Sequence, residues 1–108
     1  MTREERLRVF AEGKANLRVY DSPGCIICRQ VVPAIGKFVD NNRRCIVYEK
    51  LHYFDHTAEL KSIFDLKQGL EFPLVVVEGR RGTYKANGYV STSLISSYVV
   101  SASGCDIR

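Results

Sequence analysis

The sequence has no tryptophan, a single methionine, only three prolines and no long hydrophobic run. A membrane-spanning helix needs about 20 consecutive apolar residues. The longest apolar runs here have only the length of a β-strand, so no membrane partner is expected. The first residues, MTREERLRVFAEGK, are charged throughout and lack the continuous apolar core of a secretory signal. We therefore expect a cytoplasmic protein.

The chain also lacks a concentration of charge and a high density of cysteine. Its net charge is +4, but the lysines and arginines are scattered singly or in pairs, so no nucleic-acid partner is expected. Four cysteines in 108 residues are too few for a disulfide scaffold. The apolar content of 45% is that of a globular protein, and the length allows one compact domain over residues 1–108. Nothing in the sequence demands more than a monomer.

Hydrophobic spacing predicts helices and strands in alternation. In chain order they are a helix at 3–12, a strand at 16–20, a helix from about 25 to 40, a strand at 45–51, a helix at 56–69, strands at 72–79 and 83–87, and a last helix after residue 91. This order predicts an α/β fold with a central mixed sheet of about four strands and helices on both faces. Residues 1–15 are expected to hold the N-terminal helix, and residues 102–108 to form a flexible tail.

The segment YDSPGCIICRQ places two cysteines at the start of the second predicted helix. The free backbone N–H groups and the dipole of a helix N-terminus stabilise a thiolate, which lowers its pKa below the free value of about 8.5. Cys25 is therefore the candidate nucleophile. Cys28 lies one turn later on the same side of the helix and is the candidate resolving thiol. Gly24 and Pro23 leave room for a substrate backbone, so the pattern predicts thiol–disulfide exchange.

Three segments resemble the thioredoxin and glutaredoxin family. CIICRQVVPAI is similar to the active-site helix of thioredoxins, in which a proline follows the second cysteine by five positions, as Pro33 does here. EFPLVVVEG resembles the strand that begins with a cis-proline, and NGYVSTSLI resembles the start of the last helix. The resemblance implies the thioredoxin fold, a redox-active Cys25–Cys28 disulfide, a cis peptide bond before Pro73, and substrate pairing with the backbone of Phe72.

The sequence departs from that family at the residue that accepts a proton from the second cysteine. Thioredoxins carry a buried Asp six residues before the first cysteine, where this chain has Val19. The candidate replacements are Asp21, from the same strand, and Glu49 or Lys50, from the next one. The dipeptide Ile26-Ile27 is typical of neither thioredoxins nor glutaredoxins, so the redox potential and the direction of exchange stay open.

The expected partners are disulfide-containing proteins and an electron donor, either a flavoprotein reductase or glutathione. No bound cofactor is expected. An N-terminal helix without a preceding strand is more like a glutaredoxin. The glutathione-binding residues of that branch cannot be matched, because Phe72 precedes Pro73 and no Asp begins the last helix. Glutathione therefore stays one of two candidate reductants.

Three alternative interpretations concern Cys25 and Cys28, and Cys45 and Cys105 are interpreted separately. Cys25 and Cys28 could form a zinc site with His52 and His56, although the 23 residues between Cys28 and His52 exceed the usual zinc-finger spacing. The pair could also bind an iron–sulfur cluster shared between subunits, or the domain could be a redox-inactive binding module. Cys45, inside a predicted strand, is interpreted as a small buried hydrophobic residue. Cys105, in the predicted tail, is expected to be exposed and free, with regulatory or intermolecular disulfide formation as the minor alternative.

Overall fold

The structure is a computed structural model that describes residues 1–107. Its elements are α1 (Arg3–Ala11), β1 (Ala15–Asp21), α2 (Ile26–Asp40), β2 (Ile46–His52), η1 (Tyr53–His56), α3 (Thr57–Lys61), η2 (Leu66–Gln68), β3 (Leu74–Gly79), β4 (Gly82–Asn87) and α4 (Thr92–Ser103). In residues 1–107 no helix is long and apolar enough to cross a membrane. Apart from the third helix, each predicted helix and strand is present with small shifts of its ends.

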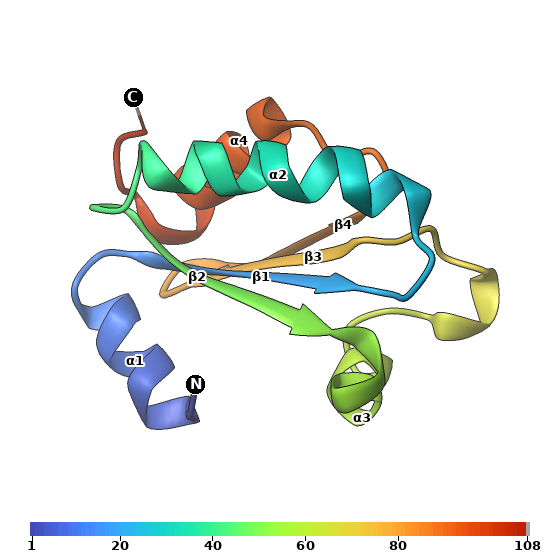
Figure 1. The fold of residues 1–108 in the computed structure, drawn as a ribbon. Helices are drawn as coiled ribbons and strands as arrows, with labels where there is room; N and C mark the ends of the chain where they lie inside the picture. The colour runs from blue at the N-terminus through green and yellow to red at the C-terminus, as the bar shows by residue number, and fades with distance from the viewer. Residues whose placement is uncertain (108) are drawn as a thin grey trace.

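The four strands form one mixed sheet in the order β2-β1-β3-β4 (Figure 1). β1 runs parallel to β2 and antiparallel to β3, and β3 and β4 form an antiparallel hairpin. Helices α2 and α4 cover one face, whereas α1 and α3 lie on the other (Figure 1). This is the α/β architecture with helices on both faces that the sequence predicts.

The strand β1 is central and contributes to a core on each side of the sheet. Its side chains alternate, so that Leu17 and Val19 pack with α2 and α4 while Tyr20 packs with Leu60 of α3. These side chains are fully buried. Each such apolar side chain stabilises the fold by about 1.5–3 kcal/mol relative to its exposed state. The alternation also decides which polar residues of β1 and β2 face the cysteines.

The third helix is shorter than predicted. The spacing predicts a helix over residues 56–69, but α3 ends at Lys61 and the separate turn η2 follows. The hydroxyl of Ser62 donates to the carbonyl of Glu59 at 2.7 Å, and the carboxylate of Asp65 accepts from the N–H of Lys67. Both side chains thus hydrogen-bond to backbone groups, an arrangement that competes with a regular helix. The predicted apolar face is nevertheless buried, because Leu60 and Phe64 belong to the core.

The C-terminal segment differs from the predicted flexible tail. Helix α4 includes Ala102 and Ser103, both of which are buried, and Ile107 packs against the larger core. Cys105 is bonded to Cys45 and is half-buried, so the expectation of a free, exposed Cys105 is wrong. Cys45 is buried as predicted, but it is a disulfide partner rather than only a hydrophobic residue. The segment is held because α4 ends beside the start of β2, which the linear sequence does not reveal.

Candidate active site

Cys25 and Cys28 lie where β1 gives way to α2. Cys25 is the N-cap of α2, and its Sγ accepts a hydrogen bond from the backbone N–H of Cys28 at 3.0 Å. The two residues form a disulfide with their Cα atoms 5.3 Å apart. Cys28 is only 7% exposed, whereas Cys25 is half-buried. Cys25 is therefore the more accessible of the two residues, and its sulfur lies beside the backbone N–H of Cys28 at the start of α2.

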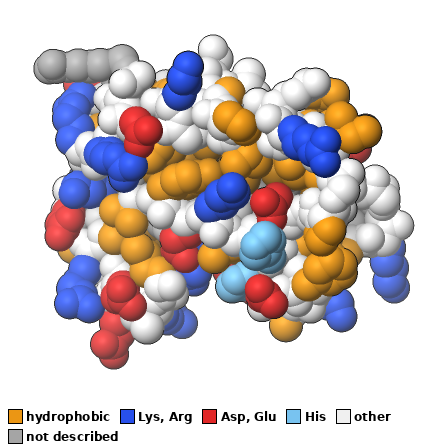
Figure 2. Space-filling view, viewed as in Figure 1, with side chains coloured by type: hydrophobic (Ala, Val, Ile, Leu, Met, Phe, Trp, Pro, Cys, Tyr) orange, Lys and Arg blue, Asp and Glu red, His pale blue; other side chains and the backbone are white. Residues whose placement is uncertain are grey.

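A groove of about 570 Å³ borders Cys25 on one side. We call it the apolar groove, and it is lined by Ser22, Pro23, Gly24, Cys25, Ile26, Ile27, Glu71, Phe72 and Tyr89. Ile26 is 71% exposed and Tyr89 65% exposed, and both belong to the same groove, so they form part of one exposed apolar surface. Hydrophobic side chains gather at the end of the molecule where α2 begins (Figure 2). The groove thus offers an apolar surface next to the sulfur of Cys25.

The loop before β3 forms the opposite wall of the apolar groove. The Phe72–Pro73 peptide bond is cis, and Phe72 lines the groove while Pro73 is buried. The ring of Phe72 meets the ring of Tyr53 edge-on, with the ring centroids 5.0 Å apart. Gly24, at φ +73°, is in the left-handed region that favours glycine. The structure therefore brings Gly24, Phe72 and Cys25, three of the predicted site residues, to one groove, whereas Pro73 is buried and does not line it.

A second, smaller hollow of about 270 Å³ lies on the other side of Cys25. We call it the polar hollow, and it is lined by Asp21, Ser22, Gly24, Cys25, Cys28, Arg29, Val32, Pro33 and Lys50. Asp21 and Val19 share the face of β1 that looks toward α2, because side chains two residues apart in a strand point the same way. Val19 is buried. Asp21 therefore lies two residues nearer the end of β1 than Val19, which occupies the position at which thioredoxins carry their carboxylate.

Asp21 has two further polar neighbours on β2. Its Oδ1 atom is buried, and Nδ1 of His52 lies 2.9 Å from it, forming an ion pair when His52 is protonated. Burial raises the pKa of Tyr48, and the nearby charge of Asp21 raises it further. The hydroxyl of Tyr48 is buried and has no hydrogen-bond partner in the part of the chain that the structure describes. Asp21 is thus set in a partly buried polar cluster beside Cys28.

Glu49, one of the two candidate proton acceptors on β2, faces away from the cysteines. Its carboxylate accepts a hydrogen bond from the Asn16 side chain at 3.0 Å and pairs with the N-terminal amino group and with Arg6. These contacts lie on the sheet face that α1 covers. Glu49 is therefore excluded as a partner of Cys28 by strand alternation, whereas Lys50, the next residue, lines the polar hollow.

The histidines are not brought to the cysteines as a zinc site would require. His52 pairs with Asp21, and Nδ1 of His56 lies 3.2 Å from Oε2 of Glu59. Figure 2 shows the histidine side chains beside acidic ones on a single patch of the surface. Among residues 1–107, no three His, Cys, Asp or Glu side chains are grouped so as to hold a metal ion. The zinc interpretation is therefore not supported by the structure.

Three residues of this site were not anticipated from the sequence. Tyr89 and Glu71 line the apolar groove, and Tyr48 lies near Asp21. Tyr89 carried a signal, since an aromatic residue in a loop next to a glycine, before a helix cap, is a candidate for exposure. Glu71 and Tyr48 carried none, because their place depends on how the loop before β3 and the strand β2 pack in three dimensions.

Comparisons with known proteins agree on the fold. No family model matches the sequence, and no curated protein sequence is significantly similar to it. Among solved structures, Trxlp from Edwardsiella tarda EIB202 is similar with a TM-score of 0.66 and 13% identity, over 92% of this chain and 94% of that one. Fasciola hepatica thioredoxin gives a TM-score of 0.63 and 13% identity, over 88% of each chain.

A third similar structure is the first thioredoxin domain of mouse protein disulfide-isomerase A4. It gives a TM-score of 0.60 and 18% identity, over all of this chain and 78% of that one. At this level of identity the likeness defines the fold. The chain has the thioredoxin fold, which confirms the fold predicted from its sequence.

Proposed function

We propose that this protein is a thiol–disulfide oxidoreductase that acts on disulfides in other proteins through Cys25 and Cys28. The observation that carries the proposal is the position of Cys25. It caps α2, its sulfur accepts the Cys28 N–H, and it lies at the junction of the apolar groove and the polar hollow. A thiolate formed at this atom is stabilised by the helix start and is open to attack a substrate.

The reaction begins with the reduced pair. The Cys25 thiolate attacks one sulfur of a substrate disulfide, forms a mixed disulfide, and releases the other substrate sulfur as a thiolate that takes a proton. The Cys28 thiol then loses its proton and attacks Sγ of Cys25. This closes the Cys25–Cys28 disulfide and releases the second substrate thiolate. The substrate gains two electrons and the pair loses two, which a flavoprotein reductase or glutathione restores.

The polar hollow supplies a group for the proton of Cys28. Asp21 lines the same hollow as Cys28, and we assign it as the acceptor, with the Lys50 side chain lining that hollow and Nδ1 of His52 2.9 Å from the Asp21 carboxylate. Because Cys28 is nearly buried, its thiol needs such a partner to ionise. In this proposal Asp21 serves in place of the carboxylate that Val19 excludes.

The apolar groove supports a protein as substrate. An extended chain that carries a disulfide can lay apolar side chains against Ile26, Phe72 and Tyr89 while the backbone at Phe72 and Pro73 pairs with it. Gly24 leaves space for this approach, since a Cβ at this position would have no neighbour within 4 Å. A small thiol such as glutathione would cover only part of this surface, so we propose proteins as substrates and either donor as reductant.

The test is the reduction of insulin by dithiothreitol, followed by turbidity. The protein is expected to accelerate precipitation well above dithiothreitol alone, and Cys25→Ser is expected to abolish the acceleration. Cys28→Ser is the matched control, because it keeps the nucleophile and should accumulate a mixed disulfide visible on a non-reducing gel. A wild-type protein with no acceleration would favour a redox-inactive binding module instead. Repeating the assay with glutathione or a flavoprotein reductase in place of dithiothreitol identifies the electron donor.

A further inference from the structure

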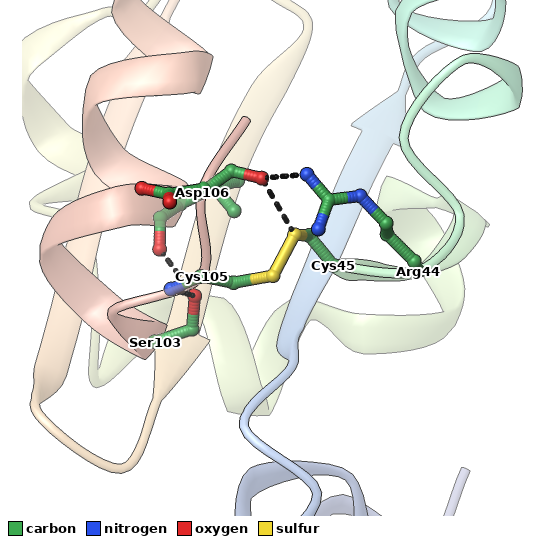
Figure 3. Close-up of a disulfide and its surroundings, with 6 residues drawn as sticks. Arg44, Cys45, Ser103, Cys105 and Asp106 are labelled. Atoms are coloured by element: carbon green, nitrogen blue, oxygen red, sulfur yellow. Dashed lines mark hydrogen bonds between the residues drawn. A yellow bond between two sulfur atoms is a disulfide. The ribbon is translucent and has the colours of Figure 1, made fainter. Parts of the chain in front are cut away.

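The C-terminal segment after α4 lies beside the residues that lead into β2. Gly104, at φ +73°, ends α4 in the left-handed conformation, and its N–H donates to the carbonyl of Val100 at 2.8 Å. The N–H of Cys105 then donates to the hydroxyl of Ser103 at 3.1 Å. The Arg44 guanidinium donates to the carbonyl of Asp106 (Figure 3). These contacts bring Cys105 to the residue that precedes β2.

The close approach of α4 to β3 depends on a residue without a side chain. A Cβ added to Gly79 would lie 2.3 Å from the carbonyl oxygen of Ala102, so only glycine fits there. The same carbonyl accepts a hydrogen bond from the N–H of Arg81 at 2.9 Å. The end of α4 thus packs on the β3–β4 turn, and this contact determines the position of residues 104–107.

The disulfide between Cys45 and Cys105 is covered on its Cys45 side by this arrangement. The two Cα atoms are 5.7 Å apart, and Cys45 is 0% exposed within the larger core. The carbonyl oxygen of Asp106 lies 3.2 Å from Sγ of Cys45, so the backbone of the segment covers this sulfur (Figure 3). Thiol–disulfide exchange requires that an incoming thiolate reach one of the two sulfurs. The folded protein leaves little room for an approach to Cys45, so only the half-buried Cys105 offers a route.

The two disulfides lie at opposite ends of the sheet. In the parallel pair, Ala15 aligns with Ile46 at one end and Asp21 with His52 at the other. Cys45 adjoins the first end, and Cys25 follows the second. Six residues of strand at about 3.3 Å each separate the ends by about 20 Å. The sulfurs of one pair therefore cannot attack those of the other within one folded molecule.

We propose that Cys45–Cys105 is a permanent structural crosslink that fastens residues 104–107 to the start of β2 and takes no part in turnover. It forms when the two thiols transfer two electrons, and lose their two protons, to a disulfide donor such as oxidised glutathione, which becomes two thiols. Once formed, the bond is sheltered from reductants that open Cys25–Cys28. That Cys45–Cys105 takes no part in turnover rests on the proposed function, whereas the expectation that Cys25–Cys28 is reduced first does not.

The test follows both bonds in the same molecule. The oxidised protein is incubated with graded dithiothreitol, quenched with iodoacetamide, digested, and analysed by mass spectrometry for the four cysteines. In the native protein, Cys25–Cys28 is expected to open at least 100-fold faster than Cys45–Cys105. In guanidinium chloride the two rates should become similar, because the fold no longer shelters either bond. Equal rates in the native protein would overturn the proposal, whether or not the protein reduces insulin.

A variant without the crosslink tests the second half of the proposal. Cys45→Ala/Cys105→Ala is expected to keep insulin reduction within twofold of wild type, while amide hydrogen exchange at residues 103–107 becomes at least tenfold faster. A loss of turnover as complete as that of Cys25→Ser, in a variant whose circular dichroism is unchanged, would show that this pair takes part in exchange. If the variant does not fold, the reduction experiment still decides between the two roles.

Discussion

The two ends of the sheet carry the same bond in opposite surroundings. At one end, Cys25–Cys28 spans a sequence separation of 3 and opens onto two hollows. At the other, Cys45–Cys105 spans a separation of 60, and the sulfur of Cys45 is covered by backbone and core. In the chain-entropy model the stabilisation that a disulfide gives grows with the logarithm of the length of the loop it closes, whereas its reactivity depends on access to its sulfurs. Reactivity and stabilisation are therefore assigned to different ends of one small domain.

The largest difference between the two ends is expected in stability. The chain-entropy relation gives about 4 kcal/mol for a loop closed by Cys45–Cys105 and about 2 kcal/mol for the short loop closed by Cys25–Cys28. We therefore expect Cys45→Ala/Cys105→Ala to lower the free energy of unfolding by about 4 kcal/mol, roughly twice the loss in Cys25→Ala/Cys28→Ala. Urea unfolding of the oxidised proteins measures both. Equal losses of unfolding free energy would show that Cys45–Cys105 stabilises the fold no more than Cys25–Cys28 does.

The Cys25–Cys28 end, to which we assign the proposed chemistry, has signals in the sequence, whereas the Cys45–Cys105 end has none. CIIC, Pro33 and Pro73 are local signals, and the strand before Cys25 follows from alternation. The Cys45–Cys105 bond depends on α4 ending beside the start of β2, a contact between segments 60 residues apart. Nothing near Cys105 in sequence indicates that contact. A Ser- and Gly-containing segment instead favours a tail.

Side-chain direction shows a second limit of the sequence. Alternation along β2 was enough to separate Glu49 from Lys50, once the face toward α2 was known. The sequence alone did not fix that face, because β2 lacks a clean alternation of buried and exposed residues: Tyr48 and Glu49 are both partly exposed, and Lys50 is exposed. The helix predicted at 56–69 is correct in part, because Leu60 and Phe64 are buried, but Ile63 is only half-buried and α3 ends at Lys61. Apolar spacing reports which side chains are buried, whereas Ser62 and Asp65 decide where the helix ends.

The next largest effect is expected at the polar hollow, in the step that Cys28 performs. We expect Asp21→Asn to slow the attack of Cys28 by about 100-fold at pH 7, the lower end of what a positioned general base contributes. Its rate should then fall about tenfold for each unit of decreasing pH, because only thiol that has already ionised can react. The wild-type rate should fall less steeply, since the carboxylate still accepts the proton.

This step can be measured by itself. The protein is loaded with a thionitrobenzoate group on Cys25, and the release of that coloured thiol reports the attack of Cys28 in a single turnover. Cys28→Ser should show no release. Glu49→Gln is the matched carboxylate control, because Glu49 lies on the opposite face of the sheet and pairs with Asn16 and Arg6. If Asp21→Asn and Glu49→Gln give the same rate and pH profile as wild type, Asp21 is not the acceptor.

The smallest effect is expected at the apolar groove, where Glu71 is the single charged residue among the described residues that line it. A Cβ added to Gly88 would lie 3.0 Å from Oε2 of this carboxylate, so the carboxylate rests close to the Gly88 backbone beside Tyr89. An exposed ion pair contributes about 0.2–1 kcal/mol. We therefore expect a disulfide peptide with Lys near its cysteine to react about two- to threefold faster than the same peptide with Glu.

The charge of Glu71 can be separated from its shape. In Glu71→Gln the preference for the Lys peptide should disappear, while the rate with a neutral peptide stays that of wild type. In Glu71→Lys the preference should reverse. Raising the salt concentration should weaken the wild-type preference, because salt screens exposed charges. Equal rates for the two peptides with the wild-type protein at low salt would show that the groove selects by apolar contact alone. Substrate choice would then depend on Ile26, Phe72 and Tyr89.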